Sequence, residues 1–130
     1  MRILLVDDDR SYLSLLSKLL RNSGHEVFCA EEGKEARELL DIEQVDLIIS
    51  DVHMPTLDGV WFQSYVREFS TVPDVPFIFI SGGDDADTQD LVVNPSLDLF
   101  LSKSLPPEEL VREVEGFVKK FVVETTRTKK

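Results

Sequence analysis

The sequence predicts one α/β domain in which five parallel strands form a doubly wound sheet with helices on both faces. Three observations predict this fold. Short apolar runs alternate with segments of helical period, two of those runs are almost continuously apolar, and 130 residues is a usual length for one domain. Alternation of strands with helices favours a parallel sheet, and unbroken apolar runs favour strands buried on both faces.

The five expected strands are short apolar runs. The first and third runs are the most continuously apolar, which places them at the centre of the sheet. In chain order the runs comprise residues 2–6, 27–30, 45–50, 77–80 and 97–101.

Segments of helical period separate these strands. The first begins after Asp9 or Ser11, either of which can cap it, and ends at Gly24, which suits the left-handed position after a helix. His25 is then expected in a surface loop. A helix between the fourth and fifth strands would be short, because Pro95 truncates it. The later segments of helical period comprise residues 36–40, 58–69, 91–93 and 107–121.

Aspartates follow the first and third strands. With the strand order 2-1-3-4-5, the flavodoxin-like arrangement, these two strands are neighbours, so Asp7, Asp8 and Asp51 converge at the carboxyl edge of the sheet. Carboxylates that lie close together repel one another and require a compensating cation. Oxygen ligands with open positions favour Mg²⁺ over a closed cage for Ca²⁺. The sequence therefore predicts a magnesium site at this edge.

Two further residues end the fourth and fifth strands. Ser81 precedes two glycines that would let a ligand approach the backbone, and Lys103 supplies an ammonium group. A hydroxyl and an ammonium opposite a cluster of carboxylates are suited to phosphoryl transfer, in which catalysis depends on positioning and on neutralising charge.

These residues resemble the receiver domains of bacterial two-component response regulators. The resemblance covers about residues 2–121. The motifs that carry it are the pair Asp7-Asp8, the segment Asp51-Val52-His53-Met54-Pro55-Thr56-Leu57-Asp58-Gly59, and the residues Ser81, Phe100 and Lys103.

The resemblance implies that Asp51 is the phosphoacceptor. It also implies that Asp8 and Asp51 bind Mg²⁺ together with the backbone carbonyl of His53, and that Asp7 acts through metal-bound water. The expected metal set is therefore Asp7, Asp8, Asp51 and His53.

The same resemblance assigns the phosphoryl oxygens to Ser81 and Lys103, and it implies that Phe100 is an aromatic switch that turns inward when Ser81 moves. Ser104 follows Lys103 where the family usually has proline, which argues against the cis peptide common there.

The resemblance further implies a sensor histidine kinase or phosphotransfer protein as donor, and a downstream effector protein or output domain as receiver of the signal. The chain would be a monomer or a phosphorylation-dependent dimer. It would not be an enzyme in the usual sense, because it would catalyse only its own aspartyl phosphorylation and dephosphorylation.

Charge and cysteine content limit the remaining classes. The formal net charge is -11, and three basic residues lie in the last four, so the rest of the chain is still more acidic and repels nucleic acid. No membrane partner is expected, because no apolar run approaches membrane-spanning length. The lone Cys29 suits a reducing compartment, and a cytoplasmic location is expected. Residues 1–121 are expected to form the receiver domain, and residues 122–130 a short basic tail.

Two alternatives stay open at this point. A phosphohydrolase of the haloacid-dehalogenase type would use Asp7 as nucleophile, with Asp9, Ser81 and Lys103 in a similar order. It would also need an acid pair late in the chain, whereas Glu108 and Glu109 lie at a helix start. A flavin- or nucleotide-binding module would need a phosphate-cradling loop after the first strand, where three aspartates stand instead.

Overall fold

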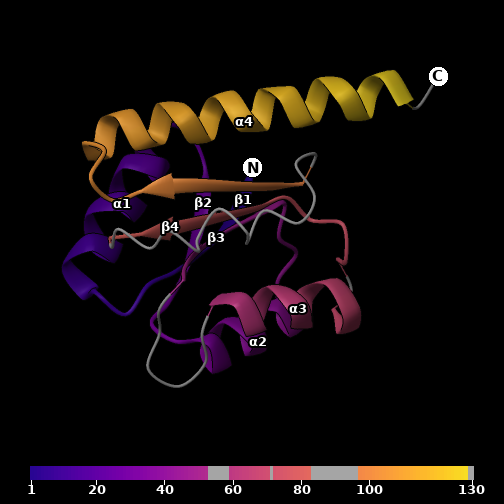
Figure 1. The fold of residues 1–130 in the computed structure, drawn as a ribbon, viewed down its shortest axis with the longest axis horizontal. Coiled ribbons are helices and arrows are strands. Elements are labelled where there is room, and N and C mark those ends of the chain that lie inside the picture. The colour runs from indigo at the N-terminus through magenta and orange to yellow at the C-terminus, as the bar shows by residue number, and fades with distance from the viewer. Residues whose placement is uncertain (53–58, 71, 83–96, 129–130) are drawn as a thin grey trace.

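The computed structural model describes residues 1–52, 59–70, 72–82 and 97–128. Figure 1 shows three layers, with the sheet between α1 and α4 on one side and α2 and α3 on the other. The described helices are α1 (Arg10–Asn22), α2 (Gly33–Ile42), α3 (Gly59–Phe69) and α4 (Pro107–Thr128).

The sheet has the predicted order, β2-β1-β3-β4-β5, and its strands pair in parallel throughout. This confirms the doubly wound α/β fold. The carboxyl ends of all five strands therefore lie at one edge. The strands are β1 (Arg2–Val6), β2 (Glu26–Ala30), β3 (Leu47–Asp51), β4 (Phe77–Ser81) and β5 (Asp98–Ser102).

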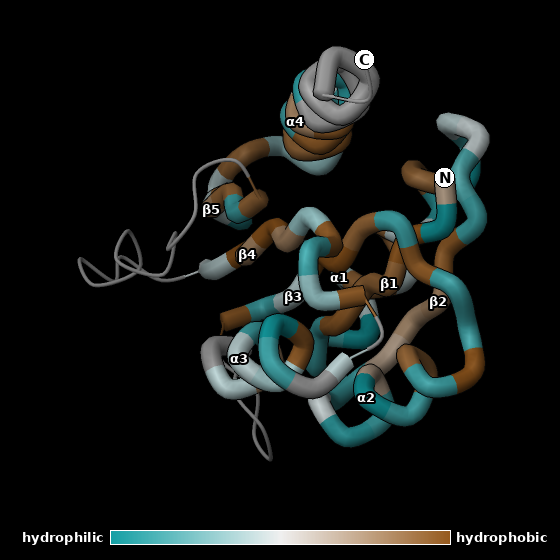
Figure 2. The backbone as a smooth tube through the Cα atoms, turned by 90° about the vertical axis from the view of Figure 1, so that its right-hand side faces the viewer, coloured by the Kyte–Doolittle hydropathy of each residue, from teal (hydrophilic) through white to brown (hydrophobic). Residues whose placement is uncertain are grey.

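The sheet buries an apolar cluster on each face. Alternate residues of the central strands point to opposite faces, so Ile3 packs with α1 and α4, while Leu4 packs with α2 and α3. All five residues of β3 and of β4 are buried, as expected for strands covered on both sides. In Figure 2 the brown, hydrophobic stretches lie along the sheet, and α2 is mostly teal on its outer side.

Helix α1 has the predicted caps. The Asp9 carboxylate accepts a hydrogen bond from the Tyr12 amide, so Asp9 rather than Ser11 caps the helix. At the other end Gly24 has φ +95°. Its amide donates to the carbonyl of Arg21, and the amide of His25 donates to the carbonyl of Leu20, which is the paired pattern of a Schellman motif.

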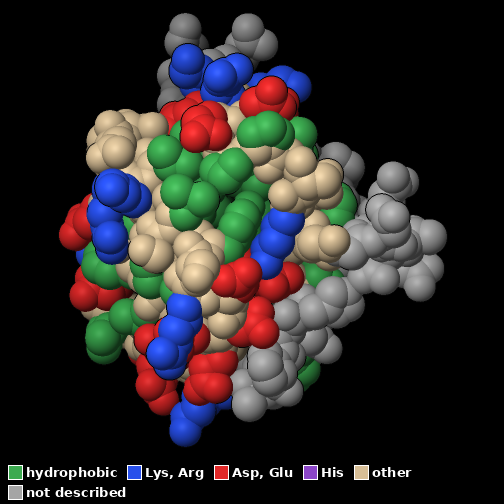
Figure 3. Space-filling view, turned by 90° about the vertical axis from the view of Figure 1, so that its left-hand side faces the viewer, with side chains coloured by type: hydrophobic (Ala, Val, Ile, Leu, Met, Phe, Trp, Pro, Cys, Tyr) green, Lys and Arg blue, Asp and Glu red, His purple; other side chains and the backbone are tan. Residues whose placement is uncertain are grey.

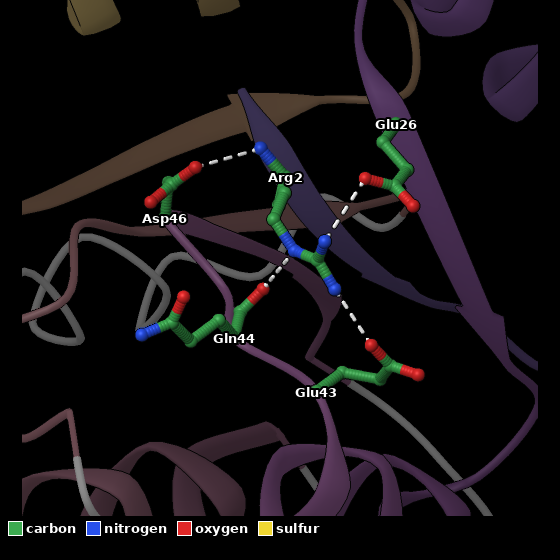
Figure 4. Close-up of polar contacts among 5 residues, drawn as sticks. All are labelled: Arg2, Glu26, Glu43, Gln44 and Asp46. Atoms are coloured by element: carbon green, nitrogen blue, oxygen red, sulfur yellow. Dashed lines mark hydrogen bonds and ion pairs between the residues drawn. The ribbon is translucent and has the colours of Figure 1, made fainter.

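Arg2 fixes the amino end of β1 (Figure 4). Its guanidinium donates to Oε2 of Glu26 at 3.1 Å, to Oε2 of Glu43 at 2.6 Å and to the carbonyl of Gln44 at 2.6 Å. Its backbone amide donates to Oδ2 of Asp46 at 2.8 Å. These contacts join β1 to β2 and to the segment before β3, at the sheet end opposite the aspartates. The strand β3 begins at Leu47, two residues after the expected start at residue 45.

His25 lies in the loop between α1 and β2, as expected, but its side chain is not on the surface. Its side chain is only 10% exposed, because Nε2 contacts Oε1 of Glu115 on α4 at 2.5 Å and Nδ1 lies 3.2 Å from the amino group of Met1. Only the expected exposure was wrong, because the residue that covers His25 lies 90 positions away in the chain.

The final helix is longer than the apolar pattern predicts. It continues past Phe121 to Thr128, so it includes residues 122–128 of the segment 122–130 that was expected to be a tail. The expected helix through residues 91–93 lies outside the described residues. No described helix is both long enough and apolar enough to span a membrane.

Candidate functional site

Parallel pairing brings the three aspartates together. Val6 of β1 is in register with Ser50 of β3, so the residues that follow, Asp7 and Asp51, lie beside each other at the carboxyl edge. Carboxylate oxygens of Asp7, Asp8 and Asp51 all lie within 4.8 Å of one another. Asp7 is fully buried and Asp51 is buried, whereas Asp8 is exposed. The predicted convergence of these acids is confirmed.

Lys103 lies at the same edge, one residue after β5. Its amide donates to the carbonyl of Ser81 at 2.9 Å, which links the ends of β4 and β5. Its Nζ lies 2.7 Å from Oδ2 of Asp7 and 3.2 Å from Oδ2 of Asp51. One ammonium group is thus shared by the two buried carboxylates, and only 18% of the lysine side chain is exposed.

The electrostatics of the site follow from this uneven charge balance. Burial raises the pKa of Asp7, and the charge of Asp51 raises it further, against the opposing effects of Lys103 and the Asp9 amide. Burial by itself lowers the pKa of Lys103, but the two carboxylates outweigh it and the pKa lies above its ordinary value. The lysine therefore stays charged, and the acids are only partly neutralised.

Asp9 has a different role from its two neighbours. Its amide donates to Oδ1 of Asp7 at 2.9 Å, and its own carboxylate caps α1 through the Tyr12 amide at 3.1 Å. It thus orients Asp7 and starts the helix. These two hydrogen bonds explain why an aspartate stands at position 9, and Asp9 is not a member of the cluster formed by Asp7, Asp8 and Asp51.

The other predicted site residues are placed as follows. Ser81 ends β4 at the same edge and is fully buried. Phe100 is half-buried on β5 and packs against the apolar cluster on the α2 and α3 side of the sheet. His53 lies outside the described residues. Lys103 and Ser104 belong to a stretch, residues 97–128, that contains no cis peptide bond.

Tyr12 is a site residue that the sequence interpretation missed. The Nζ atom of Lys103 lies over its ring, 4.7 Å from the ring centroid. Burial raises the pKa of Tyr12, so its hydroxyl keeps its proton. The available signal was an aromatic residue in the first turn of a helix whose buried face consists otherwise of three leucines and Ser17.

Figure 3 shows the face of the molecule at the carboxyl ends of the strands. Acidic side chains gather there around a basic one, beside a hydrophobic patch. The donor set fits a hard divalent cation, because three carboxylates from two strand ends converge and, among the described residues, one ammonium group compensates them. Such an edge can bind a metal ion and an anionic group side by side.

A doubly wound sheet with acids and a lysine at its carboxyl edge defines an α/β protein suited to phosphoryl chemistry. The chain belongs to the family of the response regulator receiver domain, whose model matches residues 3–115. It is therefore a phosphoacceptor receiver domain of two-component signalling and not a conventional enzyme. The phosphohydrolase and nucleotide-binding alternatives are not favoured.

Similar sequences agree with this assignment. The chain is 31% identical to the response regulator MprA of Mycolicibacterium vanbaalenii, in a match that covers 92% of this chain. It is 29% identical to the alkaline phosphatase synthesis transcriptional regulatory protein PhoP of Bacillus subtilis, again across 92% of this chain. The matches cover 51% and 49% of those proteins, so the chain spans about half their length. An uncharacterized 14.6 kDa protein of Leptolyngbya boryana is 33% identical over 93% of this chain and 92% of its own length.

Solved structures show the same fold. The chemotaxis protein CheY4 of Vibrio cholerae has a TM-score of 0.80 at 28% identity, covering 89% of this chain and 97% of that one. A structure described as an adenylate cyclase from Rhodopirellula baltica has a TM-score of 0.82 at 28% identity, and the match covers 98% of this chain and 94% of that one.

Proposed function

We propose that Asp51 is the residue that accepts the phosphoryl group. The observation that carries this proposal is the contact of Lys103 Nζ with Oδ2 of Asp51 at 3.2 Å, inside a cluster of three carboxylates. Asp51 ends β3, a fully buried central strand, so a rigid element holds the nucleophile. Asp7 is more deeply buried and lies closer to Lys103, which suits an orienting and charge-balancing role better than attack on a phosphorus atom.

The metal ligands are proposed from the same cluster. Asp7, Asp8 and Asp51 would hold Mg²⁺, with the backbone carbonyl of His53 as a further ligand. The ion would neutralise charge on the incoming phosphoryl group. The exposure of Asp8 supports this proposal, since it leaves one side of the cluster accessible.

The phosphoryl step uses the chain's own groups. A carboxylate oxygen of Asp51 attacks the phosphorus of a phosphohistidine, an O–P bond forms, and the P–N bond breaks with its electron pair leaving on the imidazole. Lys103 would then bind an oxygen of the transferred group, as would Ser81. Hydrolysis of the acyl phosphate by water would return Asp51 to a carboxylate.

The output is proposed to pass through Phe100. Ser81 and Phe100 lie on the adjacent strands β4 and β5, and the Phe100 ring is half-buried. Movement of the Ser81 side chain toward the phosphoryl group would make room for this ring, and its inward turn would change the surface of β5.

Partners and location are proposed from the family. The donor would be a cytoplasmic sensor histidine kinase or phosphotransfer protein, and the signal would pass to an effector protein or output domain. PhoP of Bacillus subtilis is described as a transcriptional regulatory protein. Residues 1–121 are proposed as the receiver domain proper, and residues 122–130 as its basic end.

The test is incubation with acetyl phosphate and Mg²⁺, followed by measurement of intact mass. We expect a gain of one phosphoryl group that requires Mg²⁺ and is absent in Asp51→Asn. The matched control is Asp74→Asn, which removes an exposed carboxylate before β4, at the opposite end of the sheet. Labelling that persists in Asp51→Asn and disappears in Asp7→Asn would overturn the assignment.

A further inference from the structure

Tyr12 presents its ring, rather than its hydroxyl, to the site. The Lys103 ammonium lies over the ring at 4.7 Å from the centroid, within the range of about 6 Å for a cation–π contact. The Tyr12 hydroxyl is buried, and no hydrogen-bond partner for it occurs in the part of the chain that the structure describes. A buried hydroxyl without a partner is costly, so the ring face is the useful part of this side chain.

The ring is held in place from two sides. The Asp9 carboxylate accepts a hydrogen bond from the backbone amide of Tyr12 at 3.1 Å, which fixes the first turn of α1. The Asp9 amide in turn donates a hydrogen bond to the Asp7 carboxylate. The Tyr12 side chain packs against the apolar cluster under α1 and α4. The aromatic face is therefore preorganised beside the carboxylates, before any ligand binds.

The Lys103 ammonium has unequal contacts with the two buried carboxylates, and this makes the aromatic ring of Tyr12 a useful further partner. Its Nζ is closer to Asp7 at 2.7 Å than to Asp51 at 3.2 Å. A divalent cation bound by the carboxylates would neutralise Asp7 and weaken the shorter of these two contacts. An aromatic ring is no ligand for a hard cation, so its attraction for the ammonium group would persist.

We propose that Tyr12 is a positioning residue that keeps the Lys103 ammonium beside Asp51 while the carboxylates bind the metal. This inference rests on the proposed function of Asp51 and Lys103. The flexible four-carbon chain of lysine has many rotamers. The ring face restricts them to those in which the ammonium can reach the phosphoryl oxygens.

The test compares rings of equal shape and different electrostatics at position 12. The variants are Tyr12→Phe, replacement of Tyr12 by pentafluorophenylalanine, and Tyr12→Leu, with the rate of phosphorylation by acetyl phosphate measured at saturating Mg²⁺. Pentafluorophenylalanine fills nearly the same volume but reverses the charge distribution of the ring face. It therefore separates a cation–π role from packing, even if Tyr12→Leu does not fold.

We expect Tyr12→Phe to react at the wild-type rate and the pentafluorinated variant to react about 3- to 10-fold more slowly. A second readout is the proton NMR shift of the Lys103 ε-methylene group. The ring should shift it upfield in the wild type and in Tyr12→Phe, and Tyr12→Leu should lose the shift.

Equal rates for Tyr12→Phe and the pentafluorinated variant would overturn the role of Tyr12 while leaving Asp51 phosphorylation intact. An unshifted Lys103 methylene in the wild type would also overturn it. A wild-type chain that gains no phosphoryl group would instead overturn the proposed function, and the role of Tyr12 with it.

Discussion

At the scale of single residues, the site is a cluster of negative charge that is only partly compensated. Two buried carboxylates share one ammonium group, and a third carboxylate lies at the exposed side. Two unit charges about 4 Å apart interact by roughly 4 kcal/mol at an effective dielectric of 20. The metal-free fold therefore carries a repulsion that metal binding would relieve, and Lys103 is the residue that limits it.

Removal of one buried charge should stabilise the metal-free protein. Because burial raises the pKa of Asp7, ionising Asp7 costs folding free energy. Protonation of Asp7 therefore stabilises the folded state. This stabilisation is complete at a pH below 3.8, the ordinary pKa of an aspartate, and it is lost as the pH rises through the pKa of Asp7 in the folded protein. In the presence of a chelator, Asp7→Asn should melt higher than the wild type at neutral pH, with a smaller difference near pH 3.8. A difference that does not change between the two pH values would contradict this account.

Removal of the ammonium group should have the opposite effect. Lys103→Met keeps much of the chain's apolar length but leaves Asp7 and Asp51 without their shared partner, so the free energy of unfolding should fall by about 3 kcal/mol. Urea denaturation with a chelator measures this loss, and Mg²⁺ should restore part of it. The exposed Lys18 on α1 provides the control, because Lys18→Met should change stability by less than about 0.5 kcal/mol. Equal effects of the two variants would exclude a charge-balancing role for Lys103.

At the scale of elements, strand ends position the chemistry, and the strands could be predicted from the sequence. The run at residues 2–6 matches β1, and Gly24 and Asp9 fall at the ends of α1, because caps and apolar runs are local signals. The contacts of Tyr12 with Lys103 and of His25 with Glu115 could not be predicted. Each joins residues about 90 positions apart, and no local pattern encodes which side chain meets which across the packed layers.

A buried ion pair fixes the start of β5. The Arg67 guanidinium on α3 donates to Oδ1 of Asp98 at 2.6 Å and to the carbonyls of Pro73 and Val75, while the Asp98 side chain is 1% exposed. Since β5 carries Phe100 and leads to Lys103, this pair anchors the strand on which the proposed switch would depend.

Loss of this pair should therefore be costly. Asp98→Ala leaves the Arg67 charge without its carboxylate, and the free energy of unfolding should fall by about 3 kcal/mol. The control Asp74→Ala removes an exposed acid near the same strand end, and should change stability by less than about 0.5 kcal/mol. Chemical denaturation distinguishes the two, and a loss for Asp98→Ala no larger than that of the control would refute the anchoring role.

At the scale of the whole molecule, metal binding and folding should be linked. A ligand that binds only the folded state stabilises it by mass action. Mg²⁺ should therefore raise the melting temperature of the wild type, by about 4 °C for each kcal/mol by which it stabilises the folded state. Asp8→Ala should lose most of this gain and should melt higher than the wild type in chelator. The exposed Asp41 on α2 is the matched control, since Asp41→Ala should keep the full response.

The central claim is that the phosphoryl group resides on Asp51, and its position can be measured directly. Borohydride reduces an acyl phosphate on aspartate to homoserine, so the modified position can be read from fragment masses after treatment with acetyl phosphate and Mg²⁺. We predict homoserine at position 51 and unmodified aspartate at positions 7 and 8. Homoserine at position 7, with an intact aspartate at position 51, would contradict the account.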